Sequence, residues 1–132
     1  MTKKERREYY ARNAEKIRAQ KSKWRKKNPV RCREIEARRN KKLRTRTLFA
    51  YSNGKMRCAC CGERHFEFLS LDHIKGGGSK DREVNGRGND FYQYLRNNNY
   101  PPGLQVLCMN CNFAKGKFGG CPHNKKQLCE KS

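Results

Sequence analysis

The sequence predicts a small α+β domain preceded by a basic helical arm, and three observations indicate this. The first fifty residues hold 20 Lys and Arg against 5 Glu, and most of them are good helix formers. The remainder contains two short apolar segments with the character of strands, separated by polar and glycine-rich segments. Eight cysteines, four of them arranged as two C-x-x-C pairs, indicate that a metal ion staples this second part. We therefore expect two domains, residues 1–50 and residues 51–132.

The composition excludes several classes of protein. Only 34% of the 132 residues are apolar, and the mean hydropathy is -1.21, so a large hydrophobic core is not available. No apolar run approaches the length of a membrane span, and the charged N-terminal segment lacks the apolar stretch of a secretory signal. We expect an intracellular protein with no membrane partner.

The charge indicates the partner. A net charge of +21 and a pI near 10.1 attract polyanions and speed their capture, so nucleic acid is the expected partner. In the arm, two interpretations stand side by side. In the first, the arm forms two basic helices that clamp the DNA backbone. In the second, the arm is a basic tail that becomes ordered only on binding.

Asn28 and Pro29 divide the arm into two expected helices, one from Lys3 to Lys27 and one over about 30–50. A weak fifteen-residue repeat runs through it. Tyr9 is followed by Asn13 four residues later, and Trp24 is followed in the same way by Asn28. Apolar residues are sparse in both helices, so neither is expected to bury a core of its own.

The second part is expected to consist of alternating short elements. We expect a strand over 66–71, a flexible basic loop over 75–89, and a short helix over 91–96 with Asp90 as its N-cap. After the turn at 97–103, a second strand is expected over 104–107. A last helix is expected to run from the second cysteine pair to Gly116.

The two C-x-x-C pairs predict a structural zinc site. Cys58, Cys61, Cys108 and Cys111 offer four thiolates, which leave no open coordination position on Zn²⁺. Cys60 can compete for a ligand position, although it shortens the first pair. A disulfide framework is the alternative, which the absence of a secretory signal disfavours.

The remaining cysteines form no familiar pattern. Cys121, His123 and Cys129 can make a second metal site with Cys32 or His65. Their spacing matches no common metal-binding pair, so the favoured interpretation is free thiols in a loose tail.

Asp72 and His73 lie between the two cysteine pairs, at the end of the first expected strand. A carboxylate beside an imidazole can hold a hard metal ion and move a proton, which makes the pair a candidate active site. A hydrogen-bonded structural histidine is the alternative.

The order of these motifs resembles the HNH (ββα-metal) endonucleases of phages and mobile elements, especially the phage recombination endonucleases. The resemblance covers about residues 55–123, and it is carried by the following segments: Cys58-x-x-Cys61, Leu71-Asp72-His73-Ile74, Leu107-Cys108-x-x-Cys111-Asn112 and Lys115-Gly116. It implies a zinc-stapled ββα-metal fold in the cytoplasm of a bacterial host.

The resemblance also implies roles for three residues. His73 would be the general base that deprotonates the attacking water, and Asp72 and Asn112 would hold one divalent ion, Mg²⁺ or Mn²⁺. The reaction would be hydrolysis of DNA phosphodiester bonds, by nicking or by double-strand cleavage. The sequence departs from the family pattern at Asn112, where the final His usually stands, and at Gly103, where the central Asn that orients the base usually stands.

Basic residues around this constellation are the expected contacts to DNA: Lys75, Lys80, Arg82, Arg87, Lys115 and Lys117. Two other functions remain open. One is a structure-specific resolvase of branched DNA, which would act as a dimer. The other is a zinc-finger DNA-binding protein in which Asp72 and His73 are structural. The sequence leaves the oligomeric state open.

Overall fold

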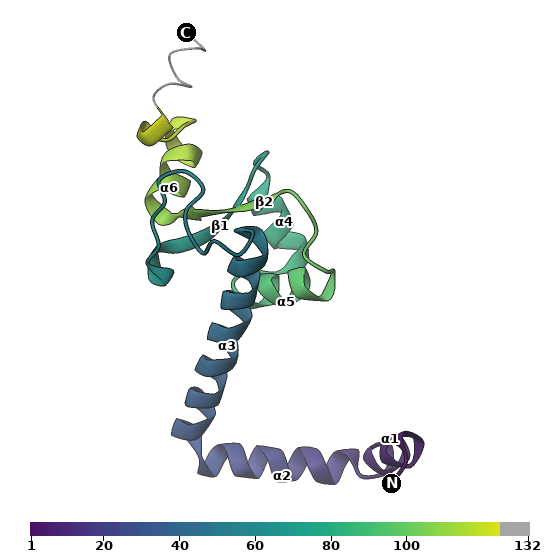
Figure 1. Cartoon of the computed structure of the whole chain (residues 1–132). Coiled ribbons are helices and arrows are strands. Elements are labelled where there is room, and N and C mark those ends of the chain that lie inside the picture. Colours follow the sequence, from purple (N-terminus) through teal and green to yellow (C-terminus); the bar gives the residue numbers. More distant parts are fainter. Residues whose placement is uncertain (125–132) are drawn as a thin grey trace. The chain divides into compact units, whose positions relative to one another are not determined.

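A computed structural model describes residues 1–124. The chain divides into two compact units, the first of which is Met1–Arg39, and the second begins at Asn40. Within the described residues, the fold consists of six α-helices and a two-stranded sheet (Figure 1), so the predicted α+β class is confirmed.

The first unit consists of helices α1 (Lys3–Arg12) and α2 (Ala14–Lys27) and the start of α3 (Pro29–Tyr51). The predicted helix over 3–27 is interrupted at Asn13, whose Nδ2 donates to the carbonyl of Tyr9 at 2.8 Å. Asn28 makes the same 2.8 Å bond to the carbonyl of Trp24. An Asn side chain competes with the backbone for carbonyls in this way, so the fifteen-residue repeat marks two successive helix ends.

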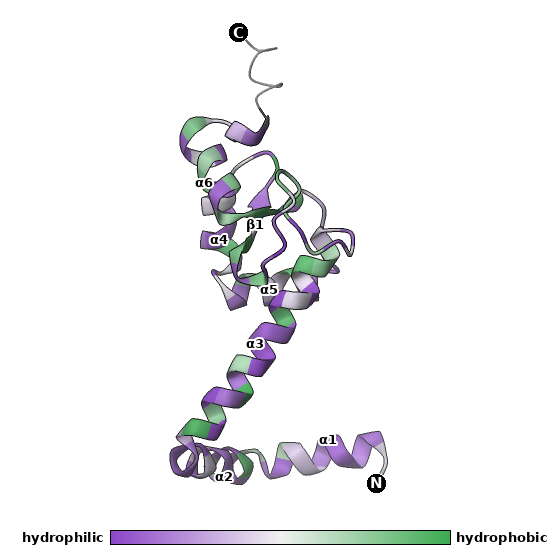
Figure 2. Ribbon diagram, turned by 60° about the vertical axis from the view of Figure 1, so that its left-hand side comes forward, coloured by the Kyte–Doolittle hydropathy of each residue, from purple (hydrophilic) through white to green (hydrophobic). Residues whose placement is uncertain are grey.

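Neither α1 nor α2 buries a residue, and Figure 2 shows hydrophilic residues over most of both helices. Helix α3 differs toward its C-terminal end, where Leu43, Thr47 and Leu48 are buried. Leu43 lies one turn before Thr47, and Leu48 belongs to the core of the second unit, so the end of α3 is part of that unit.

The sheet pairs β1 (Leu69–His73) with β2 (Leu104–Cys108) in antiparallel register, with Leu69 opposite Cys108 and His73 opposite Leu104. The first strand was expected over 66–71, but residues 66–68 form a 3-10 turn instead. Arg44 explains the shift, because its guanidinium donates to the carbonyls of Phe66 and Leu69, at 3.2 and 2.6 Å. It also lies over the Phe66 ring and so holds the turn in place.

Two helices separate the strands in the sequence. Helix α4 (Gly78–Asn85) forms where a flexible loop was expected, and α5 (Asn89–Asn97) lies close to the predicted helix. The loop prediction was wrong because the run Gly76-Gly77-Gly78 ends at the first residue of α4. Gly77 has a φ of +83°, a conformation suited to a turn that leads into a helix.

Helix α6 (Met109–Phe118) follows β2 directly. It continues past Gly116 and ends at Gly119, whose φ of +74° is the left-handed conformation typical of a helix C-terminus.

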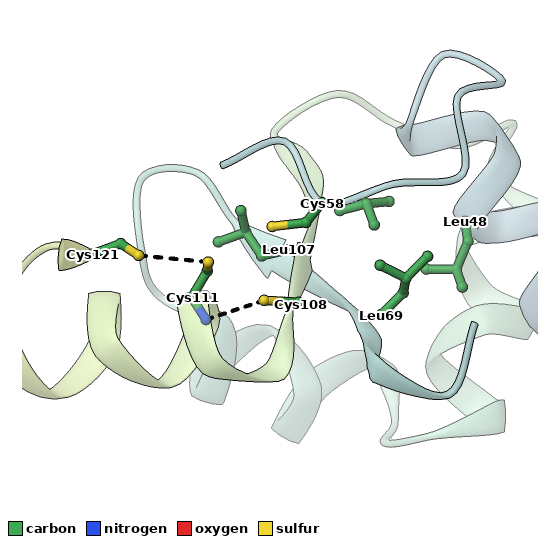
Figure 3. Close-up of a cluster of buried hydrophobic side chains, with 8 residues drawn as sticks. Leu48, Cys58, Leu69, Leu107, Cys108, Cys111 and Cys121 are labelled. Carbon is green, nitrogen blue, oxygen red and sulfur yellow. Dashed lines mark hydrogen bonds between the residues drawn. The ribbon is translucent and has the colours of Figure 1, made fainter. Parts of the chain in front are cut away.

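The core is small and rich in sulfur. Leu48, Leu69, Val106 and Leu107 supply its aliphatic part, and four cysteines complete it: Cys58, Cys108, Cys111 and Cys121 (Figure 3). A core of this size gives a domain little stability without a staple. Among residues 1–124, no helix has the length and apolar character needed to cross a membrane.

Candidate functional site

The four predicted zinc ligands lie together. The sulfur atoms of Cys58, Cys61, Cys108 and Cys111 lie within 4.8 Å of one another, and three of these residues are buried. The first two come from the turn before β1, and the others flank the junction of β2 and α6. The grouping of these four cysteines in a cluster that can hold a metal such as zinc is therefore confirmed.

Backbone amides favour the ionised form of one thiol in this cluster. Burial raises the pKa of Cys58, but hydrogen bonds from the amides of Cys61, Cys108 and Cys60 outweigh it and lower the pKa to about 7. The opposite holds for Cys111, whose pKa is raised by burial and by hydrogen bonds with neighbouring thiols. Crowded thiols of this kind need a cation before all of them can ionise.

A second group lies beside the first. It consists of Cys60, Cys111, Cys121 and His123, whose ligand atoms also lie within 4.8 Å of one another. The prediction of a loose tail was wrong for Cys121, because this residue is 8% exposed and part of the core. Gly119 turns the chain back after α6 and brings both residues to Cys111.

Among the described residues, His65 and Cys32 are not members of this group. The imidazole of His65 pairs with Glu63 at 2.5 Å, and Cys32 lies on α3 in the first unit. Cys129 lies outside the described residues.

Asp72 is 8% exposed and already carries a cationic partner. Its Oδ2 accepts from Lys115 Nζ at 2.5 Å and from Gln105 Nε2 at 2.8 Å. The ammonium of Lys115 also donates to the carbonyls of His73 and Ile74, at 2.9 and 3.1 Å. Lys115, which was predicted to contact DNA, therefore has its charge directed toward the end of β1.

Asn112 lies one turn before Lys115 on α6. Its Nδ2 donates to Ser70 Oγ at 3.0 Å and to the carbonyl of Leu71 at 3.3 Å. Because a carbonyl can only accept, the amide nitrogen faces the strand and Oδ1 is directed away from it. Helix α6 thus runs along β1 and places Asn112 beside Ser70 and Lys115 beside Asp72.

His73 faces a different set of groups. Its Nε2 lies 2.7 Å from Asp81 Oδ2, and its ring lies 5.8 Å from that of Phe91. The hydrogen bond with His73, followed by one from Asn85, lowers the pKa of Asp81. The carboxylate therefore stays ionised and holds the imidazole by one nitrogen. The carbonyl of Gly103 accepts a hydrogen bond from the backbone amide of Ile74 at 3.0 Å. Gly103 therefore bonds to the residue after His73 and not to the imidazole.

The other ring nitrogen, Nδ1, lies next to Gly78. A Cβ at this glycine would lie 2.8 Å from Nδ1 and 3.0 Å from the guanidinium of Arg82. The missing side chain lets the imidazole and the guanidinium lie close to the backbone at the start of α4. Arg82 also lines an open pocket on the α6 side, whose remaining lining residues are Ser70, Met109, Asn112, Phe113, Gly116 and Lys117.

Two of the predicted DNA contacts, Arg82 and Lys117, therefore line the pocket that contains Asn112. Lys75, Lys80 and Arg87 are exposed, and Lys80 lies on α4. Comparison with protein families, with curated proteins and with solved structures finds no match to this chain.

Proposed function

We propose that this protein is a DNA endonuclease of the HNH type, which nicks or cleaves DNA by hydrolysis of a phosphodiester bond. One observation carries the proposal. The imidazole of His73 is held through Nε2 by Asp81, and its Nδ1 and the guanidinium of Arg82, a residue that lines the pocket with Asn112, both lie close to Gly78. A candidate base and a cation suited to phosphate therefore lie close together, and that cation belongs to a residue that lines the pocket with Asn112.

His73 would act as the general base. If Nε2 carries the proton that is shared with Asp81, Nδ1 has the free lone pair and can accept a proton from a water molecule. Nδ1 lies beside Gly78, close to the guanidinium of Arg82, which would provide a bidentate donor for the phosphate that the water attacks. Asp81 is a positioning residue in this scheme, and it takes the place of the central Asn that the sequence lacks at Gly103.

The oxygen donors fit a hard divalent ion. Asp72 on β1 offers a carboxylate and Asn112 an amide oxygen, and α6 places Asn112 beside the same strand. When bound, Mg²⁺ or Mn²⁺ supplies positive charge for the scissile phosphate and the departing 3′ oxygen. Lys115 now occupies Oδ2 of Asp72 and would have to release it for such an ion to be held there.

The metal at Cys58, Cys61, Cys108 and Cys111 would be a structural Zn²⁺. Four thiolates close the coordination shell, and the ion would tie the turn before β1 to the start of α6. The arm would bind the DNA backbone, because its exposed Lys and Arg residues meet phosphate without reading sequence.

A non-catalytic DNA-binding protein is the second candidate, and one observation favours it. The ion pair of Asp72 with Lys115 neutralises the carboxylate without any divalent ion. In that case, the pair would only fix α6 on β1.

A plasmid-nicking assay of the full-length protein, with Mg²⁺ or Mn²⁺ and with EDTA, separates the two candidates. We expect metal-dependent nicking by the wild type and loss of nicking by Asn112→Ala. Asn110→Ala should nick normally, because Asn110 is an exposed residue of the same helix whose side chain makes no hydrogen bond with the described residues. A wild type that binds DNA but never nicks it would establish the second candidate.

A further inference from the structure

The group formed by Cys60, Cys121 and His123 with Cys111 has the geometry of a metal site. Cys121 Sγ lies 3.5 Å from Cys111 Sγ and 3.2 Å from His123 Nδ1. Cys111 Sγ lies 3.4 Å from the same nitrogen. One ligand atom from the first turn of α6 and two from the segment after α6 therefore lie close together. The sulfur of Cys60 lies within 4.8 Å of all three.

These separations match the edges of a tetrahedron around zinc. With Zn–S bonds of about 2.3 Å and Zn–N bonds of about 2.0 Å, the edges are about 3.8 Å between two sulfurs and about 3.5 Å between sulfur and nitrogen. The distances among Cys111, Cys121 and His123 lie within about 0.4 Å of those values. Three thiols and one imidazole are also a common ligand set for structural zinc.

Cys111 belongs to both groups. It completes the set of Cys58, Cys61 and Cys108, and it also completes the set of Cys60, Cys121 and His123. Figure 3 shows its sulfur directed toward Cys121, while its backbone amide donates to the sulfur of Cys108 at 3.4 Å. A thiolate has more than one lone pair, so one sulfur can bind two metal ions at once.

We propose that the protein binds two zinc ions in a cluster in which the thiolate of Cys111 is the bridge. Seven side chains then fill eight coordination positions, and each ion has four ligands. The second ion ties the segment after α6 back to the turn that holds Cys60, next to the first cysteine pair. This proposal does not depend on nuclease activity, since neither group includes Asp72, His73 or Asn112.

Two simpler arrangements use the same residues. A disulfide between Cys111 and Cys121 would draw their sulfurs from 3.5 Å to about 2.05 Å and would remove Cys111 from the first group. A single zinc ion in the first group would leave three mutually close ligands, Cys60, Cys121 and His123, without a cation. The bridged cluster uses every member of both groups.

Metal analysis of the full-length protein tests the proposal. We expect two zinc ions per chain in the wild type, and one in each of the variants Cys121→Ser and His123→Ala. Cys32→Ser is the matched control and should keep two, because Cys32 lies in the first unit and belongs to neither group. One zinc per folded wild-type chain, or a mass two units lower that reveals a disulfide, would overturn the proposal.

Cadmium-113 NMR of the substituted wild type tests the bridge itself and needs no variant to fold. Two cadmium ions that share one sulfur should give two signals, each split by the other. Two signals without mutual splitting would show separate sites and would refute the sharing of Cys111.

Discussion

The replacement Gly78→Ala tests the role of Nδ1 of His73 in a direct way. The new Cβ would lie 2.8 Å from Nδ1, whereas ordinary contacts begin near 3.4 Å, so the imidazole or the start of α4 has to move by roughly half an ångström. Such a shift also strains the 2.7 Å bond to Asp81. A base displaced by about 1 Å can cost about 100-fold in rate, so we expect a loss of about tenfold in nicking.

Stability should change little, because the helix preference of Ala opposes the cost of the displaced imidazole. Gly78 is the first residue of α4, and Ala is favoured over Gly within a helix by up to about 1 kcal/mol. Ser79→Ala is the matched control, since it changes the next, exposed residue and should leave the nicking rate unchanged. The assay is the initial rate of plasmid nicking, with the thermal midpoint measured in parallel. A Gly78→Ala protein with the wild-type rate would refute the assignment of Nδ1 as the reacting nitrogen.

Three further outcomes are expected. Leu48→Ala should lower the free energy of unfolding by about 2–5 kcal/mol in urea denaturation, because Leu48 is 0% exposed in the core, whereas Val84→Ala at an 82% exposed position should change it little. Because the pKa of Asp81 is lowered in the folded protein, its ionised carboxylate stabilises the fold fully above the ordinary pKa of 3.8, and this stabilisation is lost as the pH falls through the lowered pKa. Between pH 5 and pH 2, the urea midpoint should therefore fall less for Asp81→Asn than for the wild type or for the control Glu83→Gln. DNA binding should depend less steeply on salt when four exposed lysines of α2 are replaced with Gln: Lys21, Lys23, Lys26 and Lys27. The slope of log affinity against log salt should flatten by about 0.9 for each phosphate that the helix no longer neutralises. An unchanged slope would show that α2 does not touch DNA.

Much of the secondary structure follows from local signals in the sequence. The end of α2 at Asn28 and the start of α3 at Pro29 were predicted because proline has a fixed effect on helices. The start of β1 was not predicted correctly, because it depends on Arg44. This residue contacts Phe66 and Leu69 from a helix more than twenty residues earlier in the chain. Helix α4 was also missed, because its glycine-rich start has the composition of a loop.

The site was predictable where its residues recur at a familiar spacing. The two C-x-x-C pairs identified Cys58, Cys61, Cys108 and Cys111 as one group. The partner of His73 was not found, because Asp81 reaches the imidazole only through the fold of α4. The signal for the second cysteine group was present but weak: Cys121 and His123 are separated by one residue and follow a glycine that ends a helix.

The nicking rate of His73→Ala tests the central claim most directly. A general base contributes about 100- to 10,000-fold to the rate, so the variant should nick at least about 100-fold more slowly while it keeps the zinc content and the DNA affinity of the wild type. The zinc content should hold because His73 belongs to neither cysteine group, and the DNA affinity should hold because Lys and Arg supply the positive charge. If His73→Ala nicks DNA as fast as the wild type, His73 is not the base and the proposed active site is wrong.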